Sequence, residues 1–167
     1  MAYSPLEIAN TVITRHAASC GGIEHMKLQK ILFYAYGWWL AYKGTPNMKN
    51  KPEVWKYGPV FSGVYYALNR YEDQPITTPE PLSAFDTTAP QVPANDTQTL
   101  QLIDWVWKRY GHFDSFTLSE MTHKPGTPWQ IMAEKYNYRV PRYLEIDDEV
   151  TRTYFTALAQ KEGVKLN

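Results

Sequence analysis

The sequence predicts a mainly α-helical (α+β) fold: a single compact domain of about six to seven helices, with a small two- or three-stranded β element and a proline-rich loop. Apolar residues recur at helical spacing along most of the chain. Serine, threonine and aspartate residues of the kind that cap helices precede these stretches, and prolines and glycines separate them. Because 167 residues suffice for one hydrophobic core, we expect one domain over residues 1–167.

The first two predicted helices have well-marked ends. Ser4, Pro5 and Glu7 form an N-cap, a first-turn proline and a capping box, so a helix begins there and ends at the glycine pair 21–22. A second helix runs from about residue 25 to 43. Its apolar residues occupy two opposite faces, which predicts a position at the centre of the domain. A stripe of different character lies between those faces: Lys27, Lys30, Tyr34, Gly37 and Ala41.

A strand and a loop are predicted in the middle of the chain. Residues 52–57 alternate as a short strand does, and Gly58 and Pro59 then turn the chain into a helix that begins at Pro59. Residues 73–96 contain five prolines and no lysine or arginine. This segment is too long for an ordinary connection and predicts an exposed, partly mobile loop.

Helices also dominate the C-terminal half. One covers residues 97–110 with Trp105 on its outer side, a capping box at 117–120 opens a short helix, and Thr127 with Pro128 opens another. Residues 143–146 resemble a second strand that could pair with 52–57. Asp147 caps a final helix to about residue 162, whose predicted inner face is Val150, Tyr154, Ala157 and Leu158.

Composition narrows the function classes. The 17 basic residues balance the 17 acidic ones, so nothing indicates a global attraction to nucleic acid or to an anionic membrane. A single cysteine, Cys20, excludes an internal disulfide and suits a reducing cytosol. The longest apolar run, residues 31–42, is shorter than the ~20 residues of a spanning helix, and the first 25 residues show no signal-peptide pattern. We expect a cytoplasmic protein with no membrane partner.

The sequence predicts no catalytic residue, no metal site and no cofactor. Four histidines and one cysteine occur without metal-ligand spacing, and no glycine-rich phosphate loop is present. His16 and Cys20 share a helix face, but such a pair is more often structural than catalytic. His112, Asp114 and Ser115 supply the residue types of a triad, yet neighbours in one loop rarely reach triad geometry.

Two surface features suggest binding. Lys27 and Lys30 beside Tyr34, with further lysines at 49, 51 and 56, could contact a nucleic-acid backbone and its bases. Zero net charge and the lack of a helix-turn-helix motif disfavour that partner. Trp105 is a candidate for a partner surface because tryptophan is enriched in binding hot spots, although packing against another helix explains it equally well.

Three fragments, KLQKILFYAYGW, VWKYGPVFSGVY and LSEMTHKPGTPW, occur in this order. They resemble the Panacea-domain family, also described as SocA-like antitoxins and GepA-like phage-associated proteins. The resemblance covers about residues 6–131. The chain departs from the family pattern at Tyr36, Trp39 and Ser62, positions expected near the surface, so the departures bear on the partner more than on the fold.

This resemblance implies an antitoxin that neutralises a protein toxin, encoded by a neighbouring gene, by direct protein–protein binding. Some members of the family hand their toxin to an ATP-dependent protease, so a proteolytic adaptor is the alternative mechanism. A nucleic-acid-binding regulator and a hydrolase that uses His123 are two further alternatives. Neither antitoxin mechanism requires a catalytic residue.

The polar residues of the three fragments are the best candidates for partner binding, because a core seldom requires lysine or glutamine. They are expected to gather beside Trp55 and Tyr57, either as a partner site or as an internal hydrogen-bond network. The partner-binding candidates, with Trp105 added, are Lys27, Gln29, Lys30, Tyr34, Trp55, Tyr57, Pro59, Thr122, His123 and Trp105.

Overall fold

The computed structural model describes residues 2–166, and within them it confirms a mainly α-helical domain with a two-stranded antiparallel sheet. The α-helices are α1 (Pro5–Val12), α2 (His25–Lys43), α3 (Ser62–Leu68), α4 (Thr97–Tyr110), α5 (Ser115–His123), α6 (Pro128–Lys135) and α7 (Asp148–Glu162). The strands are β1 (Glu53–Trp55) and β2 (Gly58–Val60). Short helical turns extend α1 (Ile13–Ala17 and Ala18–Cys20) and α3 (Asn69–Tyr71).

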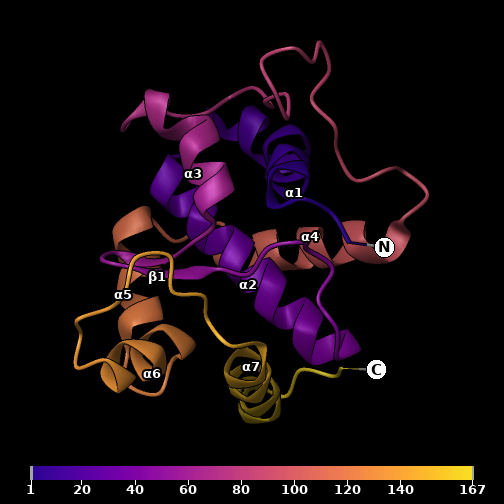
Figure 1. The fold of residues 1–167 in the computed structure, drawn as a ribbon. Helices are drawn as coiled ribbons and strands as arrows, with labels where there is room; N and C mark the ends of the chain where they lie inside the picture. Colours follow the sequence, from indigo (N-terminus) through magenta and orange to yellow (C-terminus); the bar gives the residue numbers. More distant parts are fainter. Residues whose placement is uncertain (1, 167) are drawn as a thin grey trace.

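Helix α2 is the centre of the domain, as its two apolar faces predict. It contacts α1, α3, α4, α5, α7 and β2, and Figure 1 shows it passing through the middle of the molecule with the other helices around it. Leu28 and Leu32 on one side of this helix and Phe33 and Leu40 on the other are each at most 2% exposed. A helix that is apolar all round is stable only when neighbours cover all of its faces.

Helices α2 and α7 approach each other closely at Gly37. An ideal Cβ atom added to Gly37 would lie 2.0 Å from Cε2 of Phe155, so the ring of Phe155 occupies the space that a side chain would need. Phe155 is fully buried. The inner face of α7 is therefore Thr151, Phe155 and Ala159. Of the predicted inner face, Val150, Tyr154 and Leu158 are partly buried and pack against the core, whereas Ala157 is exposed. The prediction missed the most buried residues, because Phe155 packs over Gly37.

The sheet is a hairpin in which Glu53 pairs with Val60 and Trp55 with Gly58. The prediction that a helix begins at Pro59 was therefore wrong: Gly58 has a φ of 115°, which turns the chain back as a strand, and α3 begins only at Ser62. The predicted pairing between 52–57 and 143–146 is present as an isolated bridge between Glu53 and Glu145. Backbone hydrogen bonds of 2.8 Å flank that bridge on both sides.

The helix caps agree with the sequence at three of four predicted positions. Ser4, Thr127 and Asp147 each accept a backbone N–H of the following helix. For α5 the prediction of Thr117 was wrong, since the carboxylate of Asp114 accepts the N–H of Thr117 at 2.7 Å and the helix begins at Ser115. Aspartate, with an acceptor in reach of the first turn, is among the strongest N-caps.

The proline-rich segment, residues 73–96, contains no helix or strand, as predicted, but it is not exposed throughout. The Asn10 side chain on α1 donates to the carbonyl oxygens of Glu80 and Pro90 and accepts from the N–H of Glu80. Ile76 and Val92 are buried, whereas Phe85 at the tip is 96% exposed. The segment is thus fixed to α1 at several points, and between them it loops away from the helices (Figure 1).

Candidate functional site

Five side chains from three helices hold the turn between β1 and β2. They are Gln29, Lys30, Ser119, His123 and Trp129, and each of them hydrogen-bonds a backbone group between residues 55 and 61. We call this set the turn clamp. It joins all three sequence fragments, because α2, the hairpin and the α5–α6 region each contribute one of them.

Helices α5 and α6 supply three bonds of the clamp. Trp129 Nε1 donates to the carbonyl oxygen of Trp55 at 2.7 Å, and Ser119 Oγ donates to that of Tyr57 at 2.7 Å. His123 Nε2 lies 3.1 Å from the carbonyl oxygen of Lys56. Three successive carbonyl groups of the turn are thus held, which fixes its backbone from one side.

Helix α2 holds the other end of the turn. Lys30 Nζ donates to the carbonyl oxygen of Pro59 at 3.2 Å. The Gln29 side chain accepts the N–H of Phe61 at 2.8 Å and donates to the Phe61 carbonyl oxygen at 3.3 Å. A side-chain amide that satisfies both groups of one residue replaces the partner that a neighbouring strand would provide.

Lys30 lies in a nonpolar environment, with a side chain 1% exposed. Burial lowers the pKa of its ammonium group from 10.5 to about 7. Burial also lowers the pKa of His25 to about 4, and the charge of Lys30 adds to this shift. Burial thus shifts both groups toward their neutral forms relative to water, which reduces the electrostatic cost of a polar cluster in the core.

The imidazole of His123 bridges α5 and the turn. Its Nδ1 lies 2.6 Å from the carbonyl oxygen of Ser119, and its Nε2 faces that of Lys56. Carbonyl oxygens only accept, so a neutral ring makes one of these bonds and a protonated ring makes both. The ring also packs on Trp129, with centroids 4.1 Å apart.

Gly58 allows Lys30 to pass directly under the turn. A Cβ atom at Gly58 would lie 2.6 Å from Cε of Lys30 and 2.8 Å from Oγ1 of Thr122. Its φ of 115° is one that residues with a side chain rarely adopt. The turn and the buried lysine therefore require a glycine here.

Substitution Gly58→Ala is expected to lower the free energy of unfolding by roughly 1–3 kcal/mol, because it adds backbone strain and a clash with Lys30. Urea unfolding followed by circular dichroism measures this. Gly63→Ala is the control: Gly63 lies within helix α3 with no atom within 4 Å of its would-be Cβ, so we expect a gain of roughly 0.5–1 kcal/mol. Equal effects at both positions would contradict the close packing at Gly58.

The clamp presents Tyr57 to solvent. Tyr57 is 58% exposed, and the exposed side chains of Met26 and Phe116 lie around the same cleft. This cleft has a volume of about 680 Å³, and its remaining lining residues are Ser119, Glu120, His123 and Lys124. Three large apolar side chains that share one open cleft are typical of a binding surface.

The structure separates the predicted site residues by burial. Gln29, Lys30, Tyr34, Pro59 and Thr122 are buried, whereas Lys27, Trp55, His123 and Trp105 are partly buried and Tyr57 is exposed. Side chains of the first group are covered by protein, and among them Gln29 and Lys30 bond the backbone of the turn. Lys30 and Tyr34, two of the six residues considered for nucleic-acid binding, belong to that buried group.

Several predicted surface residues have internal partners. Lys27 Nζ donates to the carbonyl oxygen of Gly111 at 2.5 Å, and Tyr34 stacks on Tyr110 at 3.8 Å between centroids. Trp105 does not point away from the domain: its ring packs edge-on against Trp38, with centroids 5.0 Å apart. Helix packing, the second interpretation of Trp105, accounts for this contact.

The positions at which the chain departs from the family pattern are not all near the surface. Tyr36 is 1% exposed, and its hydroxyl donates to the Asp148 carboxylate at 2.5 Å, so the expectation of a surface position was wrong. Trp39 and Ser62 are partly buried. The Tyr36 departure therefore affects the junction of α2 and α7, because a phenol can reach the start of α7.

Met26 and Phe116 are site residues that the sequence reasoning missed. In α5 the buried residues are Leu118, Ser119 and Thr122, and Phe116 lies on another face of that helix. The sequence signal for Phe116 was a large apolar residue outside the apolar face of its helix. Met26 gave no such signal, because most of α2 is apolar and buried.

His16 and Cys20, considered as a catalytic pair, have separate environments. His16 Nε2 lies 2.7 Å from the Asp104 carboxylate and its ring stacks on Trp107, whereas Cys20 is exposed. Within residues 2–166 no three histidine, cysteine, aspartate or glutamate side chains are grouped as metal ligands. Over the same residues, no helix has both the length and the apolar character needed to cross a membrane.

Comparison with known proteins places the residues of the clamp within a protein family. The family model described as "Antitoxin SocA-like, Panacea domain" matches residues 28–130, which include all five residues of the clamp. The chain belongs to this family. Membership indicates an antitoxin role and, in general terms, a toxin as the partner.

A curated relative in this family is the antitoxin SocA of Caulobacter vibrioides (strain NA1000 / CB15N). It is 29% identical over 157 residues, which cover 89% of this chain and 80% of the relative. A search of solved structures gives no significant match. The family resemblance seen in the three sequence fragments is thus confirmed.

Proposed function

We propose that this chain is an antitoxin that neutralises a protein toxin by direct binding, and that the toxin contacts the cleft formed by Met26, Tyr57 and Phe116. The observation that supports this most is the turn clamp. It uses five polar or aromatic side chains to fix a turn whose exposed residue, Tyr57, borders an open apolar cleft.

A fixed turn favours tight binding. Association costs free energy for every side chain or loop that becomes ordered in the complex, so a surface that is already ordered retains more of its contact energy. Tyrosine adds a large apolar ring with one polar group and few rotatable bonds, which makes it a frequent hot-spot residue. Tyr57 has these properties on a backbone held by hydrogen bonds on both sides.

Substitution Tyr57→Ala is expected to weaken toxin binding by about 10- to 100-fold, in line with a hot-spot contribution of roughly 1–3 kcal/mol. Co-expression with the neighbouring small open reading frame measures protection of growth, and calorimetry with the purified toxin measures affinity. Tyr136→Ala is the matched control, because Tyr136 is also exposed but borders none of the clefts described. Undiminished binding by Tyr57→Ala would refute this contact surface.

Toxin lifetime separates direct neutralisation from the adaptor mechanism. Direct neutralisation leaves the amount of toxin unchanged when the antitoxin is present, and it operates in cells that lack ATP-dependent proteases. An adaptor accelerates toxin loss, and its protection disappears in such cells. Growth rescue without any complex between the two proteins would contradict our proposal.

A further inference from the structure

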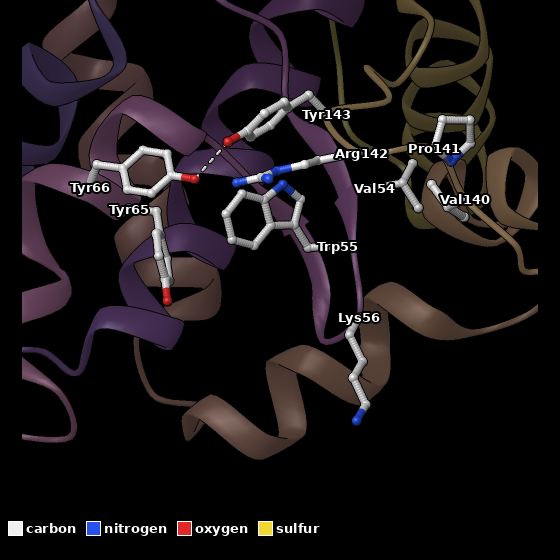
Figure 2. A pocket seen from close by; sticks show the side chains of 9 residues that line it. All are labelled: Val54, Trp55, Lys56, Tyr65, Tyr66, Val140, Pro141, Arg142 and Tyr143. Carbon is white, nitrogen blue, oxygen red and sulfur yellow. Dashed lines mark hydrogen bonds between the residues drawn. The ribbon is translucent and has the colours of Figure 1, made fainter.

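A second hollow borders the same turn, next to Trp55. It has a volume of about 410 Å³, and its aromatic walls come from Trp55, Tyr65, Tyr66 and Tyr143. Figure 2 shows the Arg142 side chain extending toward the hydroxyl groups of Tyr66 and Tyr143. Lys56 also lines this hollow, and the next residue along the chain is Tyr57. The hollow and the apolar cleft thus adjoin the same turn.

The Arg142 guanidinium has no acidic partner. Its central carbon lies 4.8 Å from the centroid of the Tyr143 ring, and the hydroxyls of Tyr66 and Tyr143 are 2.8 Å apart beside it. Among the ion pairs within residues 2–166, none involves Arg142. Two phenol oxygens cannot satisfy five N–H donors, so part of the guanidinium remains available in an exposed position.

Nearby acidic groups do not neutralise this charge. The Glu53 carboxylate is 8% exposed, and it accepts hydrogen bonds from Trp55 Nε1 and Ser62 Oγ, each at 2.9 Å. Glu145 and Asp147 line an adjoining hollow together with Lys51 and Arg142, but within residues 2–166 no ion pair joins either carboxylate to Arg142. The pKa of the Tyr66 phenol is lowered, first by its hydrogen bond with Tyr143 and then by Arg142, as expected beside an uncompensated positive charge.

The backbone around Arg142 is strained. Asn137, Tyr138 and Tyr143 have φ values of 53°, 61° and 62°, which residues with side chains seldom adopt. Each such residue costs of order 1–3 kcal/mol and persists only where surrounding structure enforces it. The bond from Val54 N to Leu144 O holds the segment against β1. Backbone contacts with β1 thus hold Tyr143 and Arg142 at the edge of the hollow in spite of the strain.

We propose that the partner bound at the exposed turn places an acidic segment in this hollow, with a carboxylate paired to Arg142 and the adjoining side chain packed on Trp55 and Tyr65. The inference rests on the proposed function, and it adds the chemistry of the partner. A guanidinium binds a carboxylate through two parallel hydrogen bonds. Aromatic walls beside that charge exclude water and strengthen the pair.

Charge reversal at Arg142 tests the inference. Arg142→Glu is expected to weaken binding of the toxin by at least tenfold and to reduce the salt dependence of its affinity. Arg139→Glu is the matched control, because Arg139 is an exposed arginine of the same segment and lines none of the hollows. Tyr66→Phe removes one hydroxyl with little effect on folding and should weaken binding more modestly. If Arg142→Glu and Arg139→Glu weaken toxin binding equally while the wild type still binds, this inference is overturned and the proposed function stands.

A titration without the toxin makes the test independent of the proposed function. A short capped peptide of alternating glutamate and glycine is added while the indole N–H signals are followed by nuclear magnetic resonance. We expect the Trp55 signal to shift in the wild type but not in Arg142→Glu, and a lysine–glycine peptide to leave it unchanged. No shift, or a shift with adenosine monophosphate or inorganic phosphate but not with the glutamate peptide, would overturn the inference. Absence of a toxin complex alongside a positive titration would refute the proposed function only.

Discussion

Replacing Lys30 with methionine is expected to raise the free energy of unfolding by about 2–4 kcal/mol at pH 7. The folded pKa of about 7, against an ordinary value of 10.5, corresponds to roughly 5 kcal/mol of cost for burying the charged form, at about 1.4 kcal/mol per unit. Methionine has a similar length and no charge, but it loses the hydrogen bond to the Pro59 carbonyl oxygen. That loss reduces the net gain.

The free energy of unfolding of the wild type should depend on pH in a direction that the lowered pKa of Lys30 determines. Between pH 7 and 10.5 the unfolded chain carries a proton on Lys30 that the folded chain has released, so wild-type stability rises with pH across this window. Below pH 7 Lys30 is protonated in both the folded and the unfolded chain, so the folded state bears the full cost of burying its charge. The stability gap between Lys30→Met and wild type should therefore narrow from pH 7 to pH 9.5 in urea unfolding. Lys108→Met, at an exposed position of α4, is the control and should show no such trend.

The second large effect is expected at the junction of α2 and α7. Gly37→Ala places a methyl group within 2.0–2.5 Å of the Phe155 ring atoms, and overpacking of this kind costs about 1–3 kcal/mol or more. The variant should unfold at correspondingly lower urea concentration. Because the residue lies in a helix, where alanine is otherwise preferred to glycine, a loss of stability reports the clash itself.

A double-mutant cycle identifies the cause. Phe155→Leu alone lowers stability by leaving space in the core, but it gives room to the methyl group that Gly37→Ala adds. The combined variant should therefore lose at least about 1 kcal/mol less than the sum of the two single changes. Additive losses would show that Gly37 and Phe155 do not interact as described.

Local sequence patterns predicted most of the helices. The boundaries of α2 and α4 agree with the predictions because glycine and aspartate residues mark them, and Thr127 with Pro128 marks the start of α6. The errors lie where a distant contact decides the local conformation. Gly58 and Pro59 are an acceptable helix start in isolation, yet Lys30 beneath them and β1 beside them favour a strand. The face of α7 likewise depends on Gly37, more than a hundred residues away in sequence.

The candidate site was predictable only in part for the same reason. The sequence predicted that polar motif residues gather near Trp55 and Tyr57, and it left open whether they form a partner site or an internal network. Lys30 and Gln29 lie in the interior because they hydrogen-bond the carbonyl oxygens of Pro59 and Phe61. No local sequence pattern reveals these distant partners. Arg142 and Tyr143 were not considered, because their importance depends on a strained connection that brings them beside Tyr66.

The turn clamp also has a consequence for engineering. Its hydrogen bonds reach only backbone atoms of the hairpin turn, so they do not depend on which side chains the turn carries at Lys56 and Tyr57. The side chains at these two positions can therefore be exchanged while the hydrogen bonds of the turn clamp are retained. Libraries that vary these positions, with Gly58 kept, would sample new recognition properties on an unchanged scaffold.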